Sequence, residues 1–253
     1  MREALEQLLL PAECLVCRAL FSFPTSRRVV CDICRHRWRP VQPPWCRRCG
    51  QPEPHFGPCR LCADWPAALQ AARSAVWLDA GARAAAHALK YGGLPRIAED
   101  LAEAMVRLEV PGREAACLVP IPLGQARERH RGYNQSERLA RALGRRWRRP
   151  VVPLLVRTRE TKTQTALTPA ARLANVAGAF ATRNGERGTR NGRTGECSAF
   201  RVPSSAFERP LILVDDVFTT GATLAEAART LERAGADTVL AVTFGRAVVP
   251  DFT

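Results

Sequence analysis

Eight cysteines within the first 62 residues constrain the fold of this chain more than any other feature of its sequence. They form four Cys-x-x-Cys pairs, with 13, 11 and 9 residues between successive pairs. A Cys-x-x-Cys turn presents two thiolates to one metal ion, and two such turns complete a tetrahedral zinc site. The pattern therefore predicts two structural zinc sites. Their expected ligands are Cys14, Cys17, Cys31, Cys34, Cys46, Cys49, Cys59 and Cys62.

Other uses of these cysteines are less favoured. Disulfides would require an oxidising compartment, and the N-terminus lacks the basic start and long apolar run of an export signal. A single redox centre would need fewer pairs. Sequential pairing would give one zinc ribbon before residue 35 and a second from residue 46 to 62, and an interleaved arrangement stays open on spacing alone. Because this segment has little periodic apolar pattern, metal binding would supply much of its folding free energy, about 10–16 kcal/mol per site.

After residue 70 the pattern changes to alternating strands and helices. The expected strands are 74–78, 116–123, 150–158, 210–216 and 237–245, and the expected helices are 81–93, 96–108, 134–147 and 223–236. A proline within 150–158 places that strand near a sheet edge. The nearly unbroken apolar run in 210–216 is typical of a strand covered on both faces. Such alternation predicts an α/β fold around a parallel sheet.

These patterns divide the chain into a double zinc-ribbon domain at 1–66 and an α/β domain at 67–253. Residues 183–206 interrupt the second domain with Arg, Gly, Asn, Ser and Thr and almost no apolar residues, so we predict a mobile surface insertion there. No apolar run approaches the length of a membrane span. We therefore expect a cytoplasmic protein without a membrane span.

The stretch LILVDDVFTTGATL, residues 211–224, carries the clearest chemical signal. Two adjacent carboxylates follow an apolar strand, and a turn of small and hydroxylated residues follows them at the start of a helix. Ligands of open α/β sheets bind beyond the carboxyl ends of strands. A helix N-terminus with exposed N–H groups holds phosphate, and paired carboxylates accept hydrogen bonds from vicinal hydroxyls. The stretch thus predicts a site for a ribose 5-phosphate.

The expected contacts divide by role. Asp215 and Asp216 would hold the ribose hydroxyls. The residues expected to hold the phosphate are Thr219, Thr220, Gly221, Ala222 and Thr223. The main alternative is a Walker B strand, as found in nucleotide-hydrolysing enzymes. Such a strand would need a phosphate-binding loop of the form G-x-x-x-x-G-K-[ST], and the sequence has none. A purely structural pair of aspartates would not require the Thr-Thr-Gly turn.

VDDVFTTGAT resembles the motif by which type I phosphoribosyltransferases bind phosphoribosyl pyrophosphate (PRPP). More narrowly, the chain resembles the ComF family, which joins N-terminal zinc ribbons to such a domain. Segments 89–93, 119–140 and 157–180 also match that family's pattern, so the resemblance covers nearly the whole chain except 183–206. The sequence departs from the pattern at Gly124, where the family often has histidine, and in the long insertion.

The resemblance implies further site residues. Pro120 and Ile121 would belong to the loop that binds pyrophosphate, and residues 157–175 would form a hood over PRPP that includes Arg157 and Lys162. Apart from Lys90 and Lys162, every basic side chain except histidine is arginine, which suggests that these two compact ammonium groups have specific roles. Asp215, Asp216 and Lys162 are the expected catalytic residues, Lys90 and Arg157 would bind PRPP, and magnesium would accompany PRPP.

Two functions follow, and they are compatible. One is transfer of a phosphoribosyl group to a nitrogenous base. The other is a PRPP-responsive module that binds single-stranded DNA, since the resemblance links the chain to natural transformation and to partner proteins that process DNA. The formal net charge of +14, the arginines of 127–149, and the arginines of 27–48 beside Trp38 and Trp45 suit such a partner. A merely solvated basic face is the alternative.

Overall fold

The computed structural model describes residues 12–22, 28–52, 59–160, 175–183 and 206–247 of the 253-residue chain. A four-stranded parallel sheet forms its centre, in the order β1-β6-β5-β2. Its strands are β1 (Leu69–Trp77), β2 (Cys117–Pro120), β5 (Leu211–Phe218) and β6 (Val239–Arg246). Every residue of β6 is buried, as expected when helices cover both faces of a parallel sheet.

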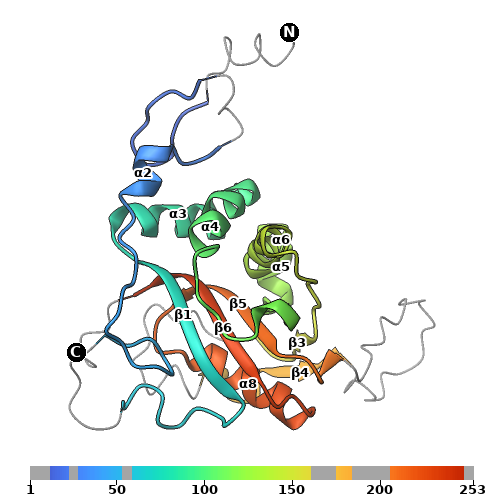
Figure 1. Cartoon of the computed structure of the whole chain (residues 1–253). Coiled ribbons are helices and arrows are strands. Elements are labelled where there is room, and N and C mark those ends of the chain that lie inside the picture. The colour runs from blue at the N-terminus through green and yellow to red at the C-terminus, as the bar shows by residue number, and fades with distance from the viewer. Residues whose placement is uncertain (1–11, 23–27, 53–58, 161–174, 184–205, 248–253) are drawn as a thin grey trace, which may run out of the picture.

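Helices cover the sheet unequally (Figure 1). One face carries α3 (Ala80–Tyr91), α4 (Ala98–Met105), α5 (Gln125–Arg131) and α6 (Gln135–Trp147), and the other carries α8 (Ala222–Arg233). The short elements are α2 (Asp32–His36) and the 3₁₀ turns η2 (Pro95–Ile97) and η3 (Arg113–Ala115). None of the helices in the described ranges is both long and apolar enough to cross a membrane. The predicted α/β fold with a parallel sheet is confirmed, and its architecture is consistent with a type I phosphoribosyltransferase fold.

Several predicted bounds differ from the structure. The strand expected at 150–158 is divided: Val151 bridges to Leu118 at the edge of the main sheet, and the chain then turns into β3 (Leu155–Arg157). β3 pairs antiparallel with β4 (Phe180–Thr182) in a separate small sheet. Pro153 lies at the division, where it cannot donate a hydrogen bond to a sheet ladder. Helix α5 and strand β4 have no counterpart among the predicted elements.

The two cysteine-rich segments pack on opposite faces of the sheet. Trp38, which follows the first four cysteines, lies in one buried cluster with residues of α3, α4 and α6, and its ring contacts Phe244 edge-on at 5.0 Å. Trp65, which follows the last four, lies in a second buried cluster with residues of α8. Both segments therefore share buried clusters with the α/β part, while the predicted division at residue 66 stays a prediction.

Candidate functional site

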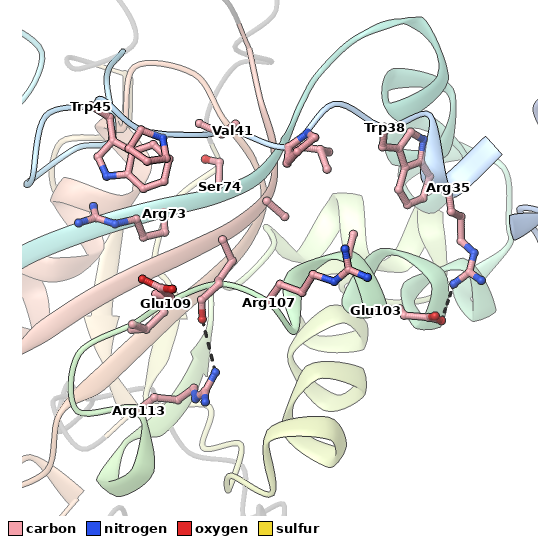
Figure 2. Close-up of a pocket in the computed structure, with 18 of the residues that line it drawn as sticks. Arg35, Trp38, Val41, Trp45, Arg73, Ser74, Glu103, Arg107, Glu109 and Arg113 are labelled. Atoms are coloured by element: carbon pink, nitrogen blue, oxygen red, sulfur yellow. Dashed lines mark hydrogen bonds and ion pairs between the residues drawn. The ribbon is translucent and has the colours of Figure 1, made fainter. Parts of the chain in front are cut away.

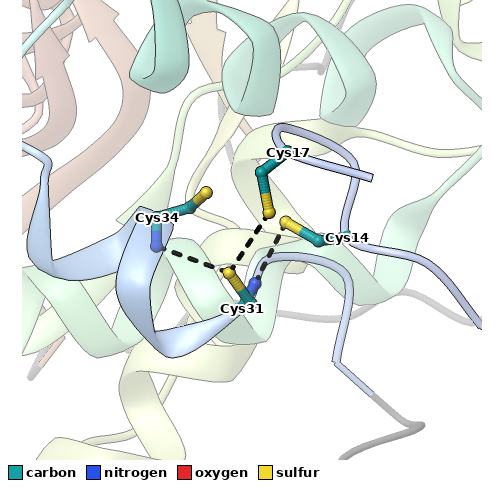
Figure 3. A group of neighbouring side chains, drawn as sticks. All are labelled: Cys14, Cys17, Cys31 and Cys34. Atoms are coloured by element: carbon teal, nitrogen blue, oxygen red, sulfur yellow. Dashed lines mark hydrogen bonds between the residues drawn. The ribbon is translucent and has the colours of Figure 1, made fainter. Parts of the chain in front are cut away.

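The eight cysteines of the N-terminal segment form two separate clusters. Cys14, Cys17, Cys31 and Cys34 converge in one, as Figure 3 shows, and Cys46, Cys49, Cys59 and Cys62 converge in the other. Within each cluster the four sulfurs lie within 4.8 Å of one another. The grouping is the sequential one, because the first Cys-x-x-Cys turn lies beside the second and the third lies beside the fourth.

The sulfur positions fit zinc. A tetrahedral ion with Zn–S bonds of about 2.3 Å separates its sulfurs by about 3.8 Å. The sulfurs of Cys17 and Cys31 are 3.7 Å apart, and those of Cys46 and Cys62 are 3.8 Å apart. The backbone N–H of Cys31 also donates to the Cys14 sulfur at 3.3 Å. The two clusters are consistent with two structural zinc sites, and four thiolates leave no open position for catalysis.

The paired carboxylates lie at an edge of the sheet where one neighbouring strand has already ended. β2 pairs with β5 only as far as Pro120 and Val214, whereas β6 continues beside β5 from Asp215 to Phe218. The predicted strand end at Asp216 is therefore two residues short, because the β6 ladder extends it. The missing β2 partner leaves room at the carboxylates on that side of β5.

Asp215 is held by the start of α6. Its Oδ1 accepts hydrogen bonds from the Ser136 hydroxyl at 2.8 Å and from the Asp216 backbone N–H at 2.9 Å. Burial, followed by the negative charge of Asp216, raises the pKa of Asp215 to about 7. Both hydrogen bonds fall on Oδ1, so Oδ2 remains for a ligand hydroxyl or a cation.

Asp216 is buried and forms an ion pair with Lys90, whose Nζ lies 2.8 Å from Asp216 Oδ2. Lys90 stands in the last turn of α3. Burial opposes its charge, but the carboxylates of Asp216 and Asp215 outweigh this effect and raise the pKa of Lys90. The structure thus brings Lys90 to the predicted site, where it neutralises one of the two carboxylates.

The turn after β5 has the features of a phosphate site. Gly221 adopts φ +76° and precedes α8, whose N-terminus has no hydrogen bond from a capping side chain. The buried Thr220 hydroxyl has no hydrogen-bond partner in the described part of the chain. An unpartnered buried hydroxyl is costly unless a ligand or water satisfies it. Turn and hydroxyl together fit a bound phosphate.

The loop after β2 lies beside these groups. Ile121 N–H donates to the Val214 carbonyl at 3.1 Å, and the Asn134 side chain donates to the Ile121 carbonyl at 3.0 Å. Arg157, at the end of β3, reaches the Pro122 carbonyl at 3.4 Å and lies over the Phe180 ring. Burial and the charge of Arg127 lower the pKa of Arg157 to about 10. The structure therefore places Arg157 over the predicted pyrophosphate loop.

Comparison with known proteins covers both parts of the chain. The family described as "Double zinc ribbon domain" matches residues 5–63. "DNA utilization protein YhgH" of Escherichia coli (strain K12) is 29% identical over 92% of this chain and 96% of its own length. "Competence protein ComFC" of Bacillus subtilis (strain 168) is 27% identical over 88% of this chain and 89% of its own. The resemblance to the ComF family is confirmed.

A third relative matches only part of the chain. "Competence protein F" of Haemophilus influenzae (strain ATCC 51907 / DSM 11121 / KW20 / Rd) is 32% identical over 124 residues, which are 48% of this chain and 46% of that protein. The full-length similarities carry more weight, because they include the zinc ribbons as well as the α/β part.

The departure from the ComF pattern at Gly124 has a local counterpart. A Cβ atom at position 124 would overlap the Glu160 carboxylate. Glu160 uses this space to accept the Ala126 N–H at 3.0 Å at the start of α5, and its other oxygen is 3.7 Å from Arg127. In this structure the Glu160 carboxylate therefore occupies the space that a histidine at 124 would need.

Some residues at the site were not predicted from the sequence, and some predicted residues lie outside the part of the chain that the structure describes. Lys162 and hood residues 161–174 lie outside it, as do residues 184–205 of the predicted insertion. Ser136 is not among the site residues predicted from the sequence; it lies in the first turn of α6, which Asn134 caps by accepting the Ser136 N–H. The contact between Ser136 and Asp215 spans 79 residues, and no local pattern signals it.

A concave surface lies at the β1 edge, away from Asp215 and Asp216 (Figure 2). This groove has a volume of about 1120 Å³ and lies between β1, the segment 35–50 and the end of α4. Trp45 and Arg73 meet at one end, with the guanidinium 5.8 Å from the ring centre, and Arg107 is an exposed lining residue. Trp38 is 95% buried against the core, so its ring offers no stacking face.

The arginines of α6 are partly neutralised. Arg141 pairs with Glu137 on the same helix, and Arg145 and Arg146 both pair with Glu99 of α4. These pairs weaken the positive potential of that face. They favour the solvated-face alternative for α6. The β1 groove has balanced charges, because Asp100, Glu103, Glu109 and Glu114 line it together with Arg35, Arg73, Arg107 and Arg113.

Proposed function

We propose that this chain binds PRPP between the carboxyl end of β5 and the N-terminus of α8, and that it acts in DNA uptake or competence. The relatives named as DNA utilization and competence proteins support the second part. One observation carries the first part: Asp215 and Asp216 lie directly before a turn with a left-handed glycine, an uncapped helix N-terminus and the unpartnered Thr220 hydroxyl.

The expected binding mode follows from the charges. The ribose hydroxyls donate hydrogen bonds to Asp215 Oδ2. The 5-phosphate accepts hydrogen bonds from the N–H groups and hydroxyls of residues 219–223. Arg157 faces the pyrophosphate above the Pro120–Ile121 loop. Lys90 supports the site indirectly, because it pairs with the buried carboxylate of Asp216.

Phosphoribosyl transfer is the proposed reaction. The bond between ribose C1 and the pyrophosphate oxygen breaks, and its electron pair leaves with pyrophosphate. An acceptor nitrogen of a nitrogenous base donates its lone pair to C1 and then loses its proton to water. Ionised Asp215 stabilises the positive charge that develops on the sugar, and Lys162 of the hood is proposed to stabilise the leaving pyrophosphate. Magnesium bound with PRPP would neutralise pyrophosphate oxygens.

Replacing Asp215 by Asn tests the ribose assignment. Asn keeps the shape and a carbonyl oxygen for Ser136 but removes the charge-assisted acceptor, which is worth about 1.5–3 kcal/mol. We expect PRPP to bind at least about tenfold more weakly by calorimetry. Asp237→Asn, at an exposed position after α8, removes the same charge elsewhere and should leave the affinity unchanged. Equal affinity in wild type and Asp215→Asn would contradict the assignment.

A second function, binding of single-stranded DNA, is supported by the β1 groove. Trp45 is partly exposed for base stacking. Arg73 and Arg107 supply positive charge, which must outweigh the lining carboxylates Asp100, Glu103, Glu109 and Glu114 for DNA to bind. We expect Arg107→Gln to flatten the salt dependence of binding, by about 0.7 in slope for one lost phosphate contact. Trp45→Ala should weaken binding at every salt concentration. Neutral substitutions at Arg145 and Arg146 are the matched control and should change the slope less, because Glu99 already pairs with both.

A further inference from the structure

The second zinc site lies directly behind the proposed phosphate turn, whereas the first does not. We infer that the ribbon of Cys46, Cys49, Cys59 and Cys62, called ribbon 2 here, positions the turn at residues 219–223. Loss of its metal would then weaken phosphate binding at a distance from the ligand. This inference rests on the proposed function, because it concerns the same turn.

Trp65 makes the first connection. It follows Cys62 by three residues, and its N–H donates to the Cys62 carbonyl at 3.3 Å. Its ring is buried, with its centre 6.2 Å from that of Phe218. A Cβ atom at Gly221 would lie 2.7 Å from Trp65 Cζ2. Gly221 is thus required where Trp65 touches the turn, and the Trp65 ring fixes the path of the backbone there.

Arg246 makes the second connection. This arginine at the end of β6 is 98% buried. It donates to the Cys49 carbonyl and to the Gln51 side chain, both at 2.9 Å, and its guanidinium lies 4.4 Å from the centre of the Phe218 ring. Phe218 is the last residue of β5 and immediately precedes the turn. Arg246 therefore joins the backbone of ribbon 2 to the strand that carries the carboxylates.

Charge strengthens this connection. A zinc ion held by four thiolates has a net negative charge, so a loaded ribbon 2 compensates the buried Arg246 cation. Arg48, inside the ribbon, donates to the carbonyls of Cys62, Trp65, Pro66 and Leu69 and ties the ribbon to the linker. Small zinc-binding segments lose their structure without metal. Removing the zinc would release both Trp65 and Arg246 from their positions against Phe218.

The first ribbon (Cys14, Cys17, Cys31 and Cys34) contacts other elements. The backbone N–H groups of Val29 and Val30 donate to Asp100 of α4 at 2.9 and 3.1 Å, and Trp38 packs on Phe244. Within the described part of the chain, no hydrogen bond, ion pair or ring contact joins this ribbon to the turn at 219–223. The chain therefore contains its own control: two zinc sites of the same chemistry, of which one lies behind the phosphate turn.

Hydrogen exchange of the full chain tests the inference without any ligand. Cys59→Ser removes a ligand of ribbon 2, and Cys17→Ser removes one of the first ribbon; neither thiol is fully buried. We expect faster exchange of the backbone amides of residues 219–225 in Cys59→Ser but not in Cys17→Ser. PRPP affinity should fall about tenfold, equivalent to about 1.4 kcal/mol, in the first variant only.

Trp65→Leu provides a second test that keeps all eight cysteines of the two clusters. We expect unchanged zinc content, faster exchange at residues 219–225 and weaker PRPP binding. Unchanged exchange in both Cys59→Ser and Trp65→Leu, or equal changes in Cys59→Ser and Cys17→Ser, would overturn the inference. Failure of the wild-type chain to bind PRPP would refute the proposed function instead, since the exchange measurement does not depend on PRPP.

Discussion

The ion pair between Lys90 and Asp216 gives the sharpest quantitative prediction. Lys90→Met removes the ammonium group and leaves the Asp216 carboxylate buried without its cation. At 2.8 Å and an effective dielectric constant of about 20, the attraction between the two charges is about 6 kcal/mol. Desolvation offsets part of this, and breaking a buried pair typically costs about 3–5 kcal/mol. The Lys90 side chain remains 28% exposed, so we expect a loss near 3 kcal/mol.

A double-mutant cycle separates this pair from general damage. Lys90→Met combined with Asp216→Asn leaves no unpaired charge, so we expect the double variant to lose only about 1 kcal/mol and the coupling energy to reach about 3 kcal/mol. Urea unfolding of the zinc-loaded chain, followed by tryptophan fluorescence, measures each free energy of unfolding. The raised pKa of Lys90 means that its stabilisation is complete below the ordinary lysine pKa, so pH 8 is a suitable condition.

Glu137 and Arg141 on α6 provide the matched control cycle. Their ion pair is solvent-exposed, with the arginine side chain 62% exposed, so its coupling should stay below about 0.5 kcal/mol. If the Lys90 and Asp216 variants also prove additive to within about 0.5 kcal/mol, the pair does not neutralise a buried charge, and the indirect role assigned to Lys90 is wrong.

Three further outcomes are expected. Elemental analysis of reduced protein should find about two zinc ions per chain, and chelation should lower the Tm of the whole chain, because both ribbons share buried clusters with the α/β part. In the proposed binding mode the ribose hydroxyls donate to ionised Asp215, so PRPP affinity should rise about tenfold per pH unit below pH 7 and level off above it; calorimetry of Asp215→Asn should lack this component. Gly221→Ala should reduce the free energy of unfolding in urea by about 2 kcal/mol or more. Gly235 also has positive φ but no neighbour within 4 Å of a Cβ atom. Gly235→Ala should therefore lose only the free energy that it costs to hold a non-glycine residue at positive φ.

Much of the chemistry is encoded in short stretches of sequence. The Cys-x-x-Cys turns specify pairs of metal ligands, because the two thiols of each turn are already close along the chain. The run from Leu211 to Leu224 specifies a strand, two acids and a helix start in that order, so the predicted acids and turn lie together in the structure. Alternating apolar strands and amphipathic helices likewise specified the α/β class.

The tertiary structure decided which distant groups meet. Local patterns report only neighbours within a few residues, whereas Lys90 reaches Asp216, Ser136 reaches Asp215 and Trp65 reaches Gly221 across long stretches of chain. The order of the strands brings these partners together, since β5 lies between β2 and β6 and the two ribbons pack on opposite faces. The sequence alone thus predicted two zinc sites and a phosphoribose site, and only packing determined that Trp65, next to the second cysteine cluster, lies against the turn at residues 219–223.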